Sequence, residues 1–344
     1  MTTIFRSVVT ILVTVLTTAC LALPASAQAT LGAVKKRDKL LCGVNGGLPG
    51  FSLENAQQQW DGIDVDLCRG VAAAVLGDAR KITFIPTTAQ NRFDRLVAGE
   101  FDMLARNSTV TLQRATGNRA RFAVVNYYDG QAFVVPKKAG IARVSGLSDK
   151  IVCVTKGTTH QFNLMAWMKL RGTSALVLTL DTDAEMYKAY FDGRCVAVTA
   201  DATALAATLV TSGKAADHMM LPDFISKEPL GPFVRNGDSP WLDVVRWTHY
   251  AMVEAEEREI TKNNVDGRRA DATDPNVRML LGVDPGNGKA LGLDEKWAYN
   301  VIKQVGNYSE IFERNVGQAS PLGFARGSNA LWNKGGLMFA LPLR

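Results

Sequence analysis

Three clusters of polar residues have the chemistry to bind a small charged molecule. The first is Arg106-Asn107-Ser108-Thr109, followed by Arg114. A guanidinium such as that of Arg114 grips a carboxylate with two parallel N–H bonds, which fix the orientation of the ligand as well as adding energy. The structural alternative is that Thr109 or Thr111 only caps a helix and that Arg114 is solvated.

The second cluster is Gly157-Thr158-Thr159 and the third is Asp201, just before Ala202. The N–H groups at the start of a helix attract an anion, whereas the carboxylate of Asp201 attracts an ammonium group. Both clusters also fit simple helix caps. Together, the three clusters describe a receptor for a zwitterion, with Arg114 on its carboxylate and Asp201 on its ammonium. Phe51 is expected to cover the aliphatic part of the ligand.

The segments around these clusters alternate between strands and helices. The pattern predicts strands at 40–44, 81–85, 101–105, 151–154, 175–179, 195–199 and 233–235. Asp64 is expected to cap the first intervening helix, and Pro86 to end the second strand. Such alternation implies a parallel sheet with helices on both faces, and its restart near residue 150 implies two similar α/β lobes. Ligands of such sheets bind beyond the carboxyl ends of the strands, which is where the three clusters fall.

The last third of the chain has a weaker pattern. It predicts helices at 241–259 and 295–306, separated by a polar stretch at 261–289. The apolar tail at 331–339 is expected to dock on the body of the protein.

The composition excludes several classes of protein. The chain has 344 residues, of which 47% are hydrophobic and 21% charged, and this excludes collagen-like, coiled-coil and disordered chains. Its net charge of +6 is spread among well-mixed acidic and basic residues, so it predicts no nucleic-acid partner. The one long apolar stretch follows Arg6 and precedes the small residues Ala25 and Ala27. It predicts a signal peptide, residues 1–27, and therefore export. The alternatives are a retained membrane anchor or a lipoprotein modified at Cys20.

Four cysteines remain after the leader: Cys42, Cys68, Cys153 and Cys195. An even number in an exported chain favours disulfides, and four cysteines allow three pairings. We favour Cys42–Cys68 and Cys153–Cys195 because each pair then lies within one predicted lobe. The alternative is four reduced, buried thiols. No metal site or cofactor is predicted, since no spacing of ligand residues suggests one.

The sequence gives little support to catalysis. Its three histidines are His160, His218 and His249, and it contains neither H-E-x-x-H nor G-x-S-x-G. The enzymatic alternative is a lyase or dehydratase on the same fold, with Glu228 and Asp102 as acid and base. A further alternative is a ligand-sensing protein that docks on a membrane receptor.

The sequence resembles the periplasmic substrate-binding proteins of bacterial ABC importers, and most of all the general L-amino-acid-binding proteins. The resemblance extends over the whole mature chain. Its motifs include 42–45, 48–51, 64–69, 105–112, 126–131, 157–159, 225–232, 305–308, 311–317 and 330–336.

The resemblance implies a role for each candidate residue. Arg114 matches the arginine that holds the α-carboxylate, and Asp201 the carboxylate that meets the α-ammonium. The other implied ligand contacts are Thr109, Asn107, Thr158, Thr159, Phe51 as an aromatic wall, and Arg106, which either faces an acidic or amide side chain or is structural. His160 departs from the pattern, which has a small polar residue there.

The implied fold is α/β, the two-lobed type II periplasmic-binding fold, with two crossover hinge segments, a ligand cleft between the lobes and a helical C-terminal extension. The implied boundaries are 28–135 and 228–344 for the first lobe and its extension, and 136–227 for the second lobe. The expected function is capture of a polar L-amino acid such as Glu, Gln, Asp or Asn in the periplasm. The protein would act as a monomer, without catalysis, and deliver the amino acid to an inner-membrane permease.

Overall fold

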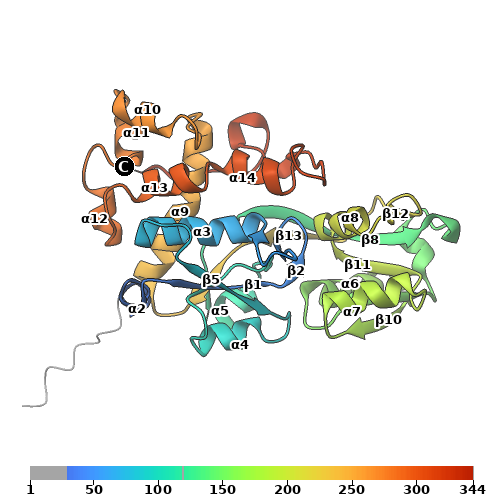
Figure 1. Cartoon of the computed structure of the whole chain (residues 1–344). Helices are drawn as coiled ribbons and strands as arrows, with labels where there is room; N and C mark the ends of the chain where they lie inside the picture. The colour runs from blue at the N-terminus through green and yellow to red at the C-terminus, as the bar shows by residue number, and fades with distance from the viewer. Residues whose placement is uncertain (1–28, 118–119, 344) are drawn as a thin grey trace, which may run out of the picture.

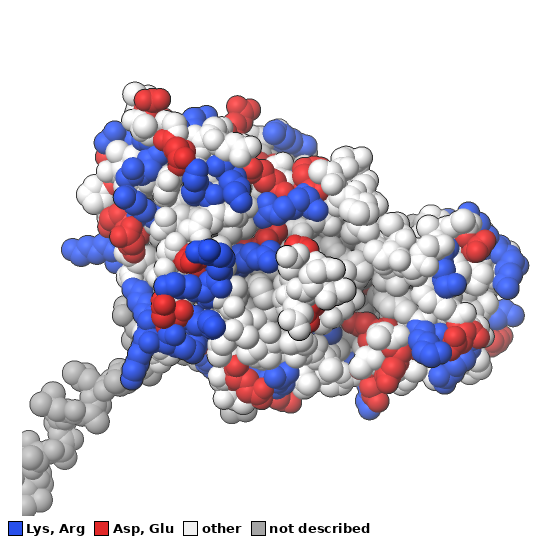
Figure 2. Space-filling view, viewed as in Figure 1, with Lys and Arg blue, Asp and Glu red and all other residues white. Residues whose placement is uncertain are grey.

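The computed structural model describes residues 29–117 and 120–343 as two lobes connected by paired strands (Figure 1). The predicted leader, its cleavage after Ala27 and Cys20 all lie outside these residues. Within the described part of the chain, no helix is both long and apolar enough to cross a membrane. Acidic and basic side chains are interspersed over both lobes on the face drawn in Figure 2, and mostly uncharged residues lie between the lobes.

Lobe 1 is built on a five-stranded sheet in the order β5-β1-β6-β14-β7. Strand β1 pairs in parallel with β5 and β6, whereas β14 pairs antiparallel with β6 and β7. The strands of the lobe, including a small separate sheet of β2, β3 and β4, are β1 (Leu40–Asn45), β2 (Gly47–Leu48), β3 (Ser52–Glu54), β4 (Trp60–Asp61), β5 (Ile82–Thr87), β6 (Met103–Leu104), β7 (Ala120–Phe122) and β14 (Phe233–Arg235).

Helices cover both faces of the lobe 1 sheet. The main core lies on one face, under α3, α9, α13 and α14, and a smaller core lies under α4 on the other face. The C-terminal helices α10 to α14 form the extension seen above and beside α3 in Figure 1. The helices of the lobe are α2 (Ala29–Arg37), α3 (Ile63–Leu76), α4 (Arg92–Val97), α5 (Leu112–Gly117), α9 (Ser239–Glu257), α10 (Val265–Ala270), α11 (Pro275–Leu280), α12 (Asn287–Leu291), α13 (Trp297–Gln304) and α14 (Tyr308–Asn315).

Lobe 2 is built on a six-stranded sheet in the order β10-β9-β11-β8-β12, with β13 also paired to β8. Successive residues of β8 point to opposite faces, so Ala132 and Val134 pack with α7 and α8, whereas Phe133 and Val135 pack with α6. The elements are β8 (Tyr127–Pro136), β9 (Ile151–Thr155), α6 (Thr159–Arg171), β10 (Leu176–Leu180), α7 (Asp183–Phe191), β11 (Ala197–Asp201), α8 (Ala202–Thr211), β12 (His218–Met220) and β13 (Ser226–Leu230).

Strands β8 and β13 carry the chain between the lobes. They pair antiparallel from Tyr127 with Leu230 to Gln131 with Ser226. Tyr127 packs in the core of lobe 1, whereas Phe133, six residues later, packs in lobe 2. The predicted boundaries at residues 135 and 228 fall within these strands and stay predictions.

Three local expectations are wrong. The sheets are mixed rather than parallel, because β8, β13 and β14 run antiparallel to their neighbours. Pro86 does not end β5, since β5 is an edge strand in which a missing N–H is tolerated. Asp64 does not cap α3, whose N-cap is Gly62. It lies in the first turn, 1% exposed, with its carboxylate turned toward the loop after β6.

The cysteines pair as Cys42–Cys68, which ties β1 to α3, and Cys153–Cys195, which ties β9 to the segment before β11. These are the pairings that the sequence favours. The C-terminal tail docks as expected, with Leu331 and Met338 buried in the core of lobe 1.

Candidate functional site

A cavity of about 370 Å³ is lined by residues of both lobes. Several of these residues follow the carboxyl ends of strands, as the fold predicts: Arg106 follows β6, Thr158 follows β9, and Asp201 ends β11. Every ligand residue expected from the sequence except Phe51 lines the cavity, namely Arg106, Asn107, Thr109, Arg114, Thr158, Thr159 and Asp201.

Phe51 does not form the expected aromatic wall. It is 1% exposed and packs edge-on against Tyr127 in the core of lobe 1, with ring centroids 5.1 Å apart. The turn before it directs the apolar ring inward, and Leu48 and Pro49 of the same loop reach the cavity instead. We therefore do not assign Phe51 to the site.

Arg114 lies on α5, and its side chain is not solvated, since only 9% of the residue is exposed. Its Nη1 donates to the backbone oxygen of Thr109 at 3.0 Å, and its guanidinium carbon lies 5.7 Å from the centroid of the Phe93 ring. Burial lowers the pKa of Arg114, whereas the charges of Glu228 and Asp201 raise it. The arginine is thus a fixed cation at the wall of the cavity, suited to a carboxylate.

Thr109 of lobe 1 and Thr159 of lobe 2 meet across the cavity, with their hydroxyl oxygens 3.4 Å apart. Both hydroxyls donate to Oε2 of Glu228, which lies on β13 and is 1% exposed. Its other oxygen, Oε1, accepts from Asn163 and Ser226. Glu228 therefore organises the polar groups of both lobes beside the crossing strands. The sequence suggests it only as a catalytic acid or base.

Asp201 is 2% exposed, and its carboxylate does not cap α8. Its Oδ1 lies 2.9 Å from Nε2 of His160 in lobe 2, and its Oδ2 accepts from Nδ2 of Asn107 in lobe 1 at 3.2 Å. The buried carboxylate is thus directed into the interface between the lobes, where it can meet a cation.

Asn107 has a left-handed backbone conformation, with φ of 31°. Asparagine tolerates this region better than most residues. The backbone N–H of Asn107 donates to Asp64 at 2.7 Å, and Asn126 donates to the other oxygen of that carboxylate at 3.0 Å. Burial raises the pKa of Asp64 to about 6, although these hydrogen bonds and the charge of Arg106 lower it. Asp64 thus positions Asn107.

Thr158 serves the helix that follows it. Its hydroxyl accepts from the backbone N–H of Gln161 at 3.3 Å and donates to the backbone oxygen of Thr155 at 2.7 Å. The hydroxyl of Thr158 therefore caps the helix α6, which was the structural alternative for this residue. The residue also lines the cavity.

Arg106 spans the cleft toward Asp183, a residue that the sequence reasoning missed. Nη2 of Arg106 lies 3.5 Å from Oδ2 of Asp183, and its Nε donates to the backbone oxygen of Thr87 at 3.1 Å. Burial raises the pKa of Asp183, but Arg106 and the hydrogen bonds from Thr155 and Asn45 outweigh it and leave the pKa lowered. Asp183 is therefore ionised and forms an ion pair with Arg106 between the lobes.

Arg92, at the start of α4, is a further residue that sequence reasoning missed. It lines the cavity, is 3% exposed, and its buried Nε has no acceptor among the described residues. Burial and the charges of Arg106 and Arg114 hold its pKa well below the ordinary value. The sequence did contain one signal for Arg92. It follows the carboxyl end of a predicted strand, as Arg106, Thr158 and Asp201 do.

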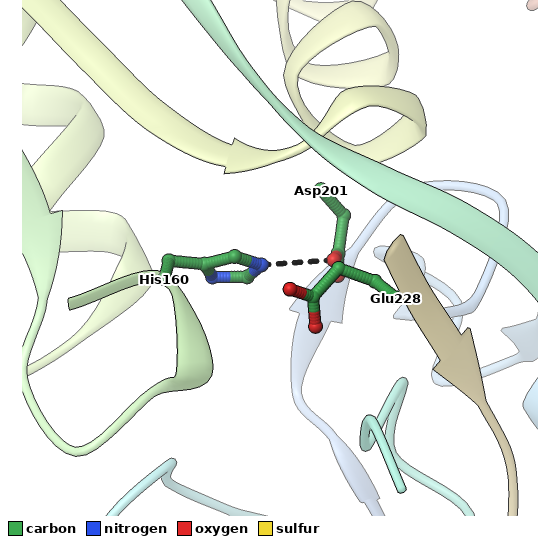
Figure 3. Close-up of side chains that lie close together, drawn as sticks. All are labelled: His160, Asp201 and Glu228. Carbon is green, nitrogen blue, oxygen red and sulfur yellow. Dashed lines mark hydrogen bonds and ion pairs between the residues drawn. The ribbon is translucent and has the colours of Figure 1, made fainter. Parts of the chain in front are cut away.

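His160, Asp201 and Glu228 lie close together, with ligand atoms within 4.8 Å of one another (Figure 3). A divalent cation favours such donors. However, the oxygens of Glu228 already accept four hydrogen bonds, and both oxygens of Asp201 have partners. Three arginines line the same cavity, and their charge opposes a bound cation. We therefore assign no metal to this cluster.

Comparison with known proteins agrees with the fold. The glutamate/glutamine/aspartate/asparagine-binding protein BztA of Rhodobacter capsulatus is 44% identical over 95% of this chain and 96% of its own length. The general L-amino acid-binding periplasmic protein AapJ of Rhizobium johnstonii is 46% identical over 95% of this chain and 96% of its own length.

A solved structure of an ABC transporter periplasmic binding protein from Brucella ovis, with glutathione bound, superposes with a TM-score of 0.89. It is 45% identical and covers 92% of this chain and 99% of its own. Residues 40–318 match the profile of the bacterial extracellular solute-binding proteins, family 3. This chain therefore belongs to the bacterial extracellular solute-binding proteins of family 3.

Proposed function

We propose that this protein is the periplasmic substrate-binding component of an amino-acid ABC transporter. It captures a free L-amino acid between its lobes and delivers it to an inner-membrane permease. The carrying observation is that Arg114 of lobe 1 and Asp201 of lobe 2 line one buried cavity with opposite charges. An amino acid carries the complementary pair on one carbon atom. The names of BztA and AapJ support the same reading.

In the proposed binding mode, Arg114 holds the α-carboxylate and Asp201 the α-ammonium. Thr109 and Thr159 add hydroxyl groups from opposite lobes, and Asn107, Thr158 and Arg106 complete the polar wall. A ligand that touches both lobes stabilises the closed form by its greater affinity for that form. Closure around the amino acid is then what the permease recognises.

The proposed side-chain preference is for acidic and amide amino acids. Arg92 brings a buried cation without an acceptor for its Nε, and Arg106 brings a second cation beside Asp183. A side-chain carboxylate would compensate the charge of Arg92 at low cost, because that guanidinium is already desolvated. The name of BztA covers the same four amino acids.

A second candidate ligand is a γ-glutamyl peptide such as glutathione. A single glutamate fills roughly 150 Å³, about five times the share of one liquid water, whereas the cavity measures about 370 Å³. The structure from Brucella ovis holds glutathione. Such a ligand has an amino-acid end for Arg114 and Asp201 and a distant carboxylate for Arg92.

Binding without catalysis is the proposed role. Glu228 is a residue that a lyase would use as acid or base. Its two carboxylate oxygens together accept four hydrogen bonds. Family membership favours a solute-binding protein over the lyase and the receptor-docking sensor. The same proposal includes three further points: export by a leader at residues 1–27, action as a monomer, and lobe boundaries at residues 135 and 228.

Thermal unfolding of residues 28–344 with each standard L-amino acid and with glutathione tests this function. Bound ligand is first removed by reversible unfolding. A ligand at about 100 times its Kd stabilises the fold by about 2.7 kcal/mol, which raises Tm measurably. Larger shifts with acidic and amide amino acids support the proposal, and a shift confined to glutathione supports the second candidate. A cooperative transition that no ligand moves contradicts both.

A further inference from the structure

His160 contacts the carboxylate of Asp201, the group that the ammonium of the proposed amino-acid ligand would bind. Its Nε2 lies 2.9 Å from Oδ1 of Asp201, and Figure 3 shows the ring directed at that carboxylate. The two residues are 8% and 2% exposed. Gln131 fixes the backbone of His160, because its Nε2 donates to the His160 oxygen at 3.0 Å. The contact is therefore built into lobe 2.

The neighbouring acceptors are also occupied. Oδ2 of Asp201 accepts from Asn107, and Glu228, the other carboxylate in Figure 3, accepts from Thr109, Thr159, Asn163 and Ser226. An ammonium that arrives at Asp201 therefore meets the imidazole first. Two cations cannot share this buried carboxylate without strong repulsion.

We propose that capture of an amino acid at Asp201 is coupled to release of a proton from His160. In the empty cleft, the imidazolium donates from Nε2 to Asp201. When the ligand binds, its ammonium takes over the charge on Asp201, and His160 gives up one proton to water and becomes neutral. One positive charge beside Asp201 replaces another, and the carboxylate of the ligand is held separately by Arg114. This inference rests on the proposed function.

The charges around His160 favour the protonated ring in the empty cleft. Its carboxylate neighbours come from three elements, with Asp201 on β11, Glu228 on β13 and Asp183 on α7. Burial lowers the pKa of His160, but the charge and hydrogen bond of Asp201 and the charges of Glu228 and Asp183 outweigh burial, so the pKa is raised. From lobe 1, Arg92, Arg106 and Arg114 line the same cavity and oppose this effect.

Two buried carboxyl groups near the site also have raised pKa values. The pKa of Asp64 is raised to about 6, mainly by burial, and that of Asp129 to about 7 by burial and by the charge of Asp201. Asp129 accepts from the backbone N–H groups of Gly130 and Thr203 and does not line the cavity. The test must therefore observe His160 itself rather than only the pH dependence of affinity.

The consequence for affinity has a definite sign. Below the pKa of His160, each binding event must first remove a proton, so the Kd rises as the solution becomes more acidic. The limiting slope is about tenfold per pH unit, which corresponds to about 1.4 kcal/mol. Above that pKa the ring is already neutral, and this contribution to the pH dependence disappears.

The direct experiment is NMR of residues 28–344 with 15N-labelled histidine, with and without L-glutamate, between about pH 5.5 and about pH 8. The chain has three histidines, and the His160→Gln variant assigns the signal of interest. We expect His160 to change from imidazolium to neutral imidazole when glutamate is added below its pKa. A ring that keeps its charge on binding overturns the inference.

Titration calorimetry supplies the matched measurement. Buffers of different ionisation enthalpy report the number of protons released as glutamate binds. We expect release by the wild type below the pKa of His160 and a much smaller release by His160→Gln, whose amide can still donate to Asp201 but does not titrate. The control is His218→Gln on β12, outside the cavity, which should release protons as the wild type does. Equal release by wild type and His160→Gln overturns the inference.

The two proposals fail in different ways. Wild-type protein that binds glutamate without proton release overturns this inference and leaves the transport function intact. Wild-type protein that binds no amino acid at any pH overturns the proposed function and this inference together.

Discussion

Asn107 in lobe 1 donates its side-chain amide to the carboxylate of Asp201 in lobe 2, with Nδ2 and Oδ2 3.2 Å apart. The proposed ammonium site is therefore assembled from residues of both lobes. Asp64 holds the left-handed backbone of Asn107 in place from the first turn of α3. A core element of lobe 1 thus helps to set the geometry of a carboxylate in lobe 2.

The charged ends of the ligand give the first prediction. Arg114→Ala and Asp201→Ala should each weaken amino-acid binding by roughly 2–5 kcal/mol, because each leaves an opposite charge unpaired in a closed cleft. Titration calorimetry with the best ligand from the thermal screen measures this loss. The control is Arg121→Ala on the exposed side of β7, which should bind normally. Affinities within about tenfold of wild type for both cleft variants would contradict the assignment of Arg114 and Asp201 to the binding site.

Arg92 gives a prediction about selectivity. Arg92→Gln should reduce the affinity for glutamate relative to glutamine by about 1.5–3 kcal/mol, the usual strength of a hydrogen bond to a charged group. Competition between the two ligands measures the ratio directly. Arg95→Gln, on the same helix but paired with Glu100 outside the cavity, is the control. An unchanged ratio in Arg92→Gln would remove Arg92 from side-chain recognition.

The segment that follows α14 gives a prediction about stability. Asn329, which is 4% exposed, accepts from the backbone N–H of Tyr128 at 2.7 Å and donates to the Tyr128 oxygen at 3.0 Å. It thereby satisfies both backbone groups of one residue of the crossing strand β8. Asn329→Ala should lower the free energy of unfolding by about 1–3 kcal/mol, because these groups lose their partners. Denaturant unfolding measures the change, and the exposed Asn333→Ala should leave stability unaltered.

The disulfides give a prediction about the free energy of unfolding, and its size differs slightly between the two lobes. They close loops of 26 and 42 residues, so the chain-entropy estimate is about 3.5 kcal/mol for Cys42–Cys68 and about 4 kcal/mol for Cys153–Cys195. Replacing each pair with serine should lower stability by amounts of this order. Calorimetric unfolding of both double variants checks the values. Variants as stable as wild type would show that neither bridge constrains the unfolded chain.

The pair of His160 and Asp201 predicts how stability depends on pH. The folded pKa of His160 is raised, so the pair stabilises the empty protein fully below about pH 6.5, and this contribution is lost as pH rises through the folded pKa. The difference in stability between wild type and His160→Gln should therefore be largest in acid and shrink toward alkaline pH. Unfolding curves of both proteins without ligand test this. A difference that grows with pH would contradict it.

The sequence by itself determined the elements and most of the polar cluster residues. Strong apolar runs such as 151–154 and 195–199 form the strands β9 and β11 where they were expected, within a few residues. Helix capping or solvation fitted Arg114, Asp201 and Thr109 individually. They could be selected because the polar clusters together suit a zwitterion and because each matches a residue of the family that the sequence resembles. The favoured cysteine pairing also followed from the order of the two α/β units.

Only the tertiary structure decided which side chains share the cavity. The sequence predicts that Phe51 is an aromatic loop residue near the ligand. In the structure it lies in the core, because Tyr127, which is distant in sequence, packs against it. Arg92, Asp183 and His160 carry no local motif and gain their roles from the closure of two lobes around one space. Local patterns fix strands and caps through short-range sterics and hydrogen bonds. Burial and charge pairing across a cleft depend on residues far apart in the chain, and these meet only in the folded protein.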